Sequence, residues 1–150
     1  MSNTDTDLGE VIIERIYDAP RELIFECMTT PAHLTHFWGP PGVSTPIDKI
    51  VLDLRVGGAF DTTMINDENG EEYHSGGVFT EIDPPSRLVW AEKGAAEGMI
   101  NASTFEDLGD GRTKVTIHQT NVPAMYRSPE ALAGFEASLD RFVAYLKTIS

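Results

Sequence analysis

The chain has 150 residues, of which 24 are Asp or Glu and 11 are Lys or Arg, giving a formal net charge of −13. This length suits one domain with a single core, and 41% hydrophobic with 23% charged residues is typical of a globular protein. The acidic balance argues against nucleic acid and anionic membranes as partners, because both are bound through clustered Lys and Arg.

The N-terminus and the cysteine content indicate a cytoplasmic protein. Residues 1–9 are polar and acidic and lack the features of a signal peptide, so we expect a flexible tail followed by one domain at residues 10–150. No apolar run approaches the roughly 20 residues of a membrane-spanning helix. Cys27 is the only cysteine, which excludes an internal disulfide and predicts a small packing residue.

The first forty residues predict one strand and two short helices. Residues 10–17 are rich in β-branched and aromatic side chains, which favours a strand. Pro20 is expected at the first position of a helix, because the apolar residues that follow recur at helical spacing. Pro31 begins a second short helix, and the Gly-Pro-Pro-Gly run at residues 39–42 must be a loop.

From residue 47 to about residue 121 the pattern changes to strands separated by turn residues. The predicted strands are residues 47–54, 59–65, 72–82, 87–92, 100–108 and 112–120. Because no helix intervenes, they should form an antiparallel meander. Such a sheet must curl to bury one face, and four glycines are expected to supply bulges or bends: Gly57, Gly58, Gly76 and Gly77.

A long amphipathic helix ends the chain. Ser128, Pro129 and Glu130 form a helix start, and the helix should run for roughly 20 residues. Its apolar face consists of Leu132, Phe135, Leu139, Phe142, Val143 and Leu146. Glu130, Glu136, Asp140 and Arg141 are expected on the opposite side. The elements together predict an α+β domain in which a curved antiparallel sheet wraps around the C-terminal helix and leaves a cavity at one end.

Several motifs in series carry a family resemblance. They are residues 11–20, 36–40, 53–58, 77–88 and 110–113. In this order they resemble bacterial homologues of the C-terminal domain of the activator of the ninety-kilodalton heat-shock chaperone's ATPase, in the SRPBCC superfamily of START-like and birch-pollen-allergen-like proteins. The resemblance covers about residues 10–148 and implies the helix-grip fold with an internal hydrophobic cavity. It does not imply one activity, because superfamily members carry lipids, bind hormones or flavonoids, cyclise polyketides or activate a chaperone.

Large apolar side chains and two strand histidines are the candidates for the cavity wall. We predict a lining by Trp38, Phe60, Met64, His74, Val78, Trp90, Phe105, His118, Phe135, Leu139 and Phe142. Core packing is the alternative role for the apolar members. Strand alternation places Phe60, Thr62 and Met64 on one face. It likewise groups Val89 with Ala91, and Val115 with Ile117 and Gln119, and a bulge at any glycine would reverse part of this assignment.

The remaining polar candidates have simpler explanations. His33 and His36 are one helical turn apart and could join a third ligand around a metal, but we expect structural roles and no metal. Arg55 should pair with a nearby acid and fix the bend before Gly57. The charged strand residues should face solvent or form ion pairs, and these are Glu14, Arg15, Glu81 and Arg87.

The leading functional hypothesis is a protein that binds a small hydrophobic or amphipathic molecule in its cavity without a cofactor. The first alternative is an enzyme of cyclase, dehydratase or hydrolase type, whose catalytic residues are unassigned and which needs His74, His118, Glu81 or a similar group to point inward. The second is a chaperone ATPase co-factor, although we expect no counterpart of the additional N-terminal domain that eukaryotic activators carry. A homodimer through a sheet edge is a further hypothesis. No motif predicts a partner nucleic acid or membrane.

Overall fold

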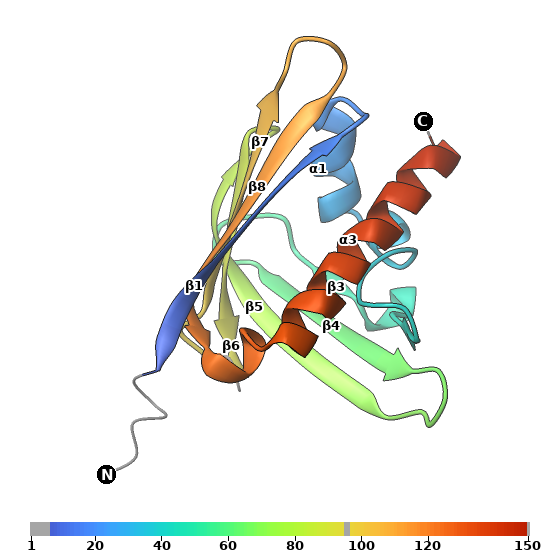
Figure 1. Ribbon diagram of the computed structural model, residues 1–150, viewed down its shortest axis with the longest axis vertical. Coiled ribbons are helices and arrows are strands. Elements are labelled where there is room, and N and C mark those ends of the chain that lie inside the picture. Colours follow the sequence, from blue (N-terminus) through green and yellow to red (C-terminus); the bar gives the residue numbers. More distant parts are fainter. Residues whose placement is uncertain (1–6, 95–96, 150) are drawn as a thin grey trace.

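One curved antiparallel sheet and one long helix dominate the structure, a computed structural model that describes residues 7–94 and 97–149 (Figure 1). The elements in chain order are β1 (Leu8–Tyr17), α1 (Arg21–Thr29), α2 (Pro31–Leu34), β2 (Val43–Ser44), η2 (Ile47–Lys49), β3 (Val51–Leu52), β4 (Ala59–Asn66), β5 (Glu72–Asp83), β6 (Arg87–Lys93), β7 (Ile100–Asp107), β8 (Thr113–Pro123), η4 (Ala124–Tyr126) and α3 (Pro129–Ile149). This is the predicted α+β architecture. None of the described helices is long and apolar enough to cross a membrane.

The sheet is a meander closed by the first strand. Its order is β1-β8-β7-β6-β5-β4-β2, with β3 paired to β4 beside β2, and every neighbouring pair is antiparallel. β1 pairs with β8 from Leu8 opposite Pro123 to Tyr17 opposite Thr113, which places the first strand of the chain beside the last. The predicted antiparallel meander is therefore confirmed for β4 to β8.

The irregularities of the sheet do not lie where the four glycines predicted them. The register shifts between Gly9 and Val11 in β1 and between Phe79 and Glu81 in β5. Gly57 instead occupies a turn with φ of +86°, a conformation that glycine adopts without steric cost. The adjoining Gly58 packs so closely on the Asp53 carbonyl that a Cβ would overlap it. These two glycines thus form the turn that precedes β4.

The segment at residues 47–54 was wrongly predicted as one strand. It forms the short helix η2 and the two-residue strand β3, while β2 comes earlier than any strand expected in this region. The carbonyl of Pro46 accepts the N–H of Lys49 at 3.0 Å, and that of Ile47 accepts the N–H of Ile50 at 3.2 Å. These i to i+3 bonds favour a 3₁₀ turn over extended backbone, and β-branched composition alone does not reveal them.

The two ends of the predicted domain differ slightly from expectation. β1 begins at Leu8, within the predicted tail, whereas residues 1–6 of that tail lie outside the described residues. Pro20 precedes α1 in an extended conformation, and its carbonyl accepts the N–H groups of Leu23 and Ile24. At the start of α3, the Ser128 hydroxyl accepts the Ala131 N–H at 3.1 Å, which confirms the predicted cap.

Helix α3 lies diagonally across the concave side of the sheet, and α1 lies near its C-terminal end (Figure 1). The main core occupies this end. Phe142 is fully buried between Tyr17 and Phe37, at ring-centroid distances of 5.2 and 4.5 Å. Cys27 is also fully buried, and burial raises the pKa of its thiol to about 11. The predicted packing role of Cys27 is therefore confirmed, since the side chain lies within the hydrophobic core.

Candidate functional site

A cavity of about 540 Å³ lies between the sheet and the N-terminal half of α3. Strands β4 to β8 supply one wall, α3 supplies another, and Trp38, Gly39 and Pro40 of the loop after α2 close a side. Most of the lining side chains are apolar. The fold therefore encloses a space large enough for a small organic molecule.

The cavity exists because α3 presents small side chains to the sheet at this level. Ala131, Gly134 and Ser138 line it at spacings of three and four residues, which places them on one helical face. A Cβ built on Gly134 would meet no atom within 4 Å. The helix therefore leaves unfilled the space that larger side chains fill further along.

Most of the predicted wall residues lie on the cavity. They are Trp38, Phe60, Met64, Trp90, Phe105, Phe135, Leu139 and Phe142. Several are linked through ring contacts. Phe60 lies 5.4 Å from Trp38, 5.4 Å from Phe79 and 5.1 Å from Trp90 between ring centroids. An aromatic surface thus forms the β4–β6 side of the cavity.

Three predicted wall residues do not line the cavity, and the prediction was wrong for them. On β5 it is Ser75 that lines the cavity and Phe79 that enters the core, so His74 and Val78 have the opposite parity. The Nδ1 atom of His74 lies 2.7 Å from the Thr63 hydroxyl. His118 likewise alternates with Ile117 and Gln119, which do line the cavity. Its Nε2 atom lies 3.1 Å from a carboxylate oxygen of Glu10.

A cluster of polar side chains lies inside the cavity, and we call it the Glu92 cluster: Ser75, Trp90, Glu92, Asn101 and Gln119. The Glu92 carboxylate accepts hydrogen bonds from Trp90 Nε1 at 2.7 Å, from Asn101 Nδ2 at 3.0 Å and from Ser75 Oγ at 3.1 Å. Gln119 Nε2 in turn donates to Asn101 Oδ1 at 2.7 Å. The cluster is one connected network across four strands.

Strand register explains how the cluster forms. Trp90 on β6 is opposite Asn101 on β7, and Asn101 is opposite Gln119 on β8, so the three side chains form a row. Glu92 follows Trp90 by two residues and shares its face. On the other side Glu92 is opposite Gly77, where a Cβ would approach the Ala91 carbonyl to 2.9 Å and Trp90 Cδ1 to 3.1 Å. The absence of a side chain at Gly77 thus leaves room for the Trp90 ring.

Burial dominates the electrostatics of Glu92. Desolvation raises the pKa of its carboxyl group, and the hydrogen bonds from Trp90, Ser75 and Asn101 oppose this effect only in part. Glu130, in the first turn of α3, is the other acidic residue on the cavity wall. No Lys, Arg or His is among the described residues that line it.

Sequence reasoning missed Glu92, although a signal was present. A glutamate in a strand is usually assigned to the solvent face. An alternation that points Val89 and Ala91 inward would also point Glu92 outward. The selection of Trp90 as a wall residue, however, places Glu92 on the same face by simple alternation. Parity relative to a large aromatic residue would have found it.

Arg141 has a structural role that its predicted solvent position did not suggest. Its Nη1 atom donates to the carbonyl oxygens of Gly39, Pro40 and Val43 at 2.9, 3.0 and 3.3 Å. Because Gly39 and Pro40 line the cavity, this guanidinium fastens one cavity wall to α3. Arg141 therefore does not belong to the outer face on which Glu136 and Asp140 hold Arg15.

The other charged candidates form surface contacts. Arg55 Nε lies 2.6 Å from Asp53 Oδ2, which confirms the predicted ion pair at the bend. Arg87 pairs with Glu81 at 3.0 Å, so Glu81 does not point into the cavity.

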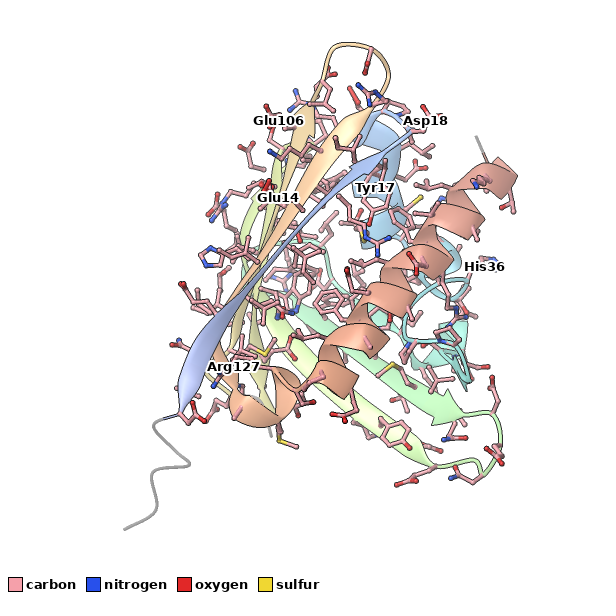
Figure 2. The ribbon with its side chains drawn as sticks, viewed as in Figure 1. Glu14, Tyr17, Asp18, His36, Glu106 and Arg127 are labelled. Carbon is pink, nitrogen blue, oxygen red and sulfur yellow. The ribbon has the colours of Figure 1, made fainter. Side chains whose placement is uncertain are left out.

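The two helical histidines pack against α3 instead of forming a cavity site. His33 Nδ1 lies 2.6 Å from the Tyr145 hydroxyl, and the His36 ring stacks on Tyr145 at 5.0 Å. Figure 2 shows His36 beside the C-terminal half of α3. In the described part of the chain, no three His, Cys, Asp or Glu side chains are grouped to hold a metal ion.

A curved sheet that grips a long helix, with a cavity between the two, defines a protein of the helix-grip fold. Within this class the chain belongs to the family described as Activator of Hsp90 ATPase homolog 1-like protein, whose model matches residues 18–147. The resemblance seen in the sequence is thereby confirmed. No curated protein matches the sequence.

Solved structures share the fold over nearly the whole chain. Protein CV1439 from Chromobacterium violaceum is 23% identical, with a TM-score of 0.82 over 91% of this chain and 96% of its own. Protein Ms6760 from Mycobacterium smegmatis is 25% identical, with a TM-score of 0.79 over 96% and 94%. The AHSA1 protein SPO3351 from Silicibacter pomeroyi is 22% identical, with a TM-score of 0.77 over 95% and 100%.

Proposed function

We propose that this protein binds a small apolar or amphipathic molecule in the cavity between the sheet and α3. The observation that carries the proposal is the cavity itself, with a volume of about 540 Å³ and a mostly apolar wall. Small-molecule sites fall in the range of roughly 300–1,000 Å³ and combine such walls with a few polar groups. The Glu92 cluster supplies those polar groups. Membership of a fold class that typically binds hydrophobic ligands adds support.

The aromatic wall gives the binding its driving force. Each methylene group of a ligand that leaves water contributes about 0.8 kcal/mol, and the rings of Trp38, Phe60 and Trp90 offer flat apolar surfaces at fixed positions. The Glu92 carboxylate is already hydrogen-bonded within the network, so an apolar chain beside it does not leave this carboxylate without partners.

The test is ligand-dependent stabilisation of the purified protein. Medium-chain alcohols and arylalkyl compounds should raise the melting temperature, because a ligand at 100 times its Kd stabilises the folded state by about 2.7 kcal/mol. Native mass spectrometry should show adducts with a stoichiometry of one. If neither compound class raises the melting temperature and native spectra show only the bare chain, the proposal is wrong.

The enzymatic hypothesis receives less support than binding. The groups it named, His74, His118 and Glu81, pair with Thr63, Glu10 and Arg87 away from the cavity. Chaperone contact and homodimerisation stay predictions. A chaperone ATPase assay and light scattering of the purified chain would test them separately.

A further inference from the structure

The charges around the cavity are distributed unevenly. Both charged side chains among the described lining residues, Glu92 and Glu130, are acidic. Arginines on the bordering elements are engaged elsewhere: Arg141 with loop carbonyls, and Arg127 with the Val122 carbonyl at 3.0 Å and Asp7 at 2.7 Å. An anionic ligand would therefore meet acidic groups and find no basic partner on the cavity wall.

The polar atoms open to the cavity include several acceptors. A carboxylate offers about four acceptor sites, and Glu92 uses three of them, so one site on Oε1 remains open. Gln119 donates through Nε2, and no described residue donates to its Oε1 atom. The Ser103 hydroxyl also lines the cavity without a hydrogen bond to a described residue. The network thus provides sites for a ligand that brings its own donors.

Aromatic rings adjoin these acceptors. Trp90 is part of the Glu92 cluster, and its ring contacts Phe60, which in turn contacts Trp38. The faces of aromatic rings carry negative electrostatic potential and attract cations, most strongly when the cation is shielded from water. A carboxylate beside aromatic faces, with no basic residue on the wall, is chemically suited to a cation on an apolar body.

We propose that the ligand of this cavity is an apolar amine, bound as its ammonium ion, with the nitrogen at the Glu92 cluster and the hydrocarbon toward Phe135 and Leu139. The inference rests on the proposed function of the cavity. An ammonium group carries three donors and no acceptor, which matches the open acceptor atoms. Burial raises the pKa of Glu92, and an adjacent ammonium would favour the ionised carboxylate again.

Three ligands that share a ten-carbon chain test the proposal: decylamine, decan-1-ol and decanoate, each titrated calorimetrically at pH 7 below its aggregation concentration. A hydrogen bond to a charged group contributes more than a neutral one by an amount that corresponds to about tenfold in Kd. We expect decylamine to bind at least about tenfold more tightly than decan-1-ol. Decanoate should bind at least about tenfold more weakly than decan-1-ol, because its charge meets Glu92.

Glu92→Gln isolates the charge while it preserves the network. The new carboxamide oxygen can accept from Trp90 and Asn101, and its NH₂ can donate to the Ser75 hydroxyl. Decylamine affinity should fall at least about tenfold, whereas decan-1-ol affinity should change less than about threefold. Unchanged binding of the alcohol also shows that the cavity of the variant is folded.

Glu106→Gln is the matched control. Glu106 lies on β7 but has the opposite parity to Asn101 and Ser103, and Figure 2 shows it on the side of the sheet away from α3. This substitution removes the same charge from the outer face. Decylamine affinity should change less than about twofold, which separates the Glu92 site from general attraction to an acidic protein.

The outcomes distinguish the two proposals. If decan-1-ol binds but decylamine binds no more tightly, or if Glu92→Gln leaves decylamine affinity unchanged, the amine inference is wrong and the binding function stands. Tighter binding of decanoate than of decan-1-ol would have the same meaning. If none of the three ligands binds, the amine inference is wrong, and the binding function is then decided by the arylalkyl compounds and the native mass spectra.

Discussion

The two halves of α3 pack against the same sheet with opposite results. In the C-terminal half Leu139, Phe142 and Leu146 are buried, with at most 6% of each side chain exposed. In the N-terminal half no residue is buried to that degree, and Ala131 and Gly134 border the cavity. One continuous helix therefore completes the packed core at one end of the domain and forms a wall of the cavity at the other.

The difference shows that the cavity is a property of side-chain size rather than of backbone architecture. At the filled end α1 adds Ile24, Phe25 and Cys27, all buried, beneath the large residues of α3. At the hollow end α3 instead presents the small residues Ala131, Gly134 and Ser138 to the sheet. Apolar side chains still cover the walls there, so the space suits an apolar ligand better than bulk water.

The largest expected effect comes from breaking the filled end. Leu146→Ala removes a side chain that is 5% exposed and leaves a void in a packed core, which should lower the free energy of unfolding by about 2–5 kcal/mol. Leu132→Ala, on the same helix at the hollow end, should cost less than half as much, because Leu132 is only half-buried. Urea denaturation measures both. Equal losses would contradict the contrast between the two halves.

A smaller effect is expected from substitution of Gly77, beside the Trp90 ring, than from Leu146→Ala. Gly77→Ala would force a methyl group against the Ala91 carbonyl and the Trp90 ring, and should cost about 1–3 kcal/mol with a change in tryptophan fluorescence. Gly76→Ala meets only the movable Asp61 carboxylate and serves as the control. Similar costs and similar spectra for the two variants would show that Trp90 is not positioned by Gly77.

Side chains added at Gly134 should have two effects at the hollow end. A methyl group should stabilise the folded protein slightly, and a larger side chain should prevent ligand binding in the cavity. Gly134→Ala should raise the free energy of unfolding by up to about 1 kcal/mol, because glycine is a poor helix residue and the site is open. Gly134→Leu should occupy the cavity and weaken decan-1-ol binding at least about tenfold while the protein stays folded. Calorimetric titration and thermal melting check the pair. Full binding by the leucine variant would exclude this space as the ligand site.

The smallest effect concerns pH. Burial raises the pKa of Glu92 above its ordinary 4.5. In the pH window between 4.5 and the raised pKa, the native state therefore binds more protons than the unfolded state. The contribution of Glu92 to stability is therefore complete below pH 4.5 and is lost as the pH rises through the raised value. Glu92→Gln does not titrate, so its stability relative to the natural protein should increase across that window. Urea melts at pH 4.5 and 7.5 measure the difference, and a pH-independent difference would contradict the assignment.

Periodicity and turn residues were sufficient to predict most of the fold. The alternation around Phe60 and Met64 gave the correct face of β4, and Ser128 gave the start of α3. Gly109 and Gly111, both with positive φ, lie in the turn that separates β7 from β8, as expected. These signals depend only on residues that are close together in the sequence, so they can be recognised without knowledge of the fold.

The polar interior was not predicted, because it depends on long-range register. Trp90, Asn101 and Gln119 become neighbours only through the pairing of three strands, and the direction of Glu92 follows from which face of β6 is inward. His74 and His118 failed as candidates for the same reason. The size of the cavity depends on Gly134 and its small neighbours Ala131 and Ser138, and small residues give no hydrophobic signal in the sequence.

The contact of Arg141 with the loop after α2 bears on how a ligand would enter. One guanidinium nitrogen bonds to the carbonyl groups of Gly39, Pro40 and Val43, so a loop that contains two prolines is tied to the helix at a single atom. An entrance on that side could open only if three hydrogen bonds broke together or if helix and loop moved as one body. The loop side of the cavity is therefore expected to stay closed during ligand exchange while Arg141 keeps these three bonds.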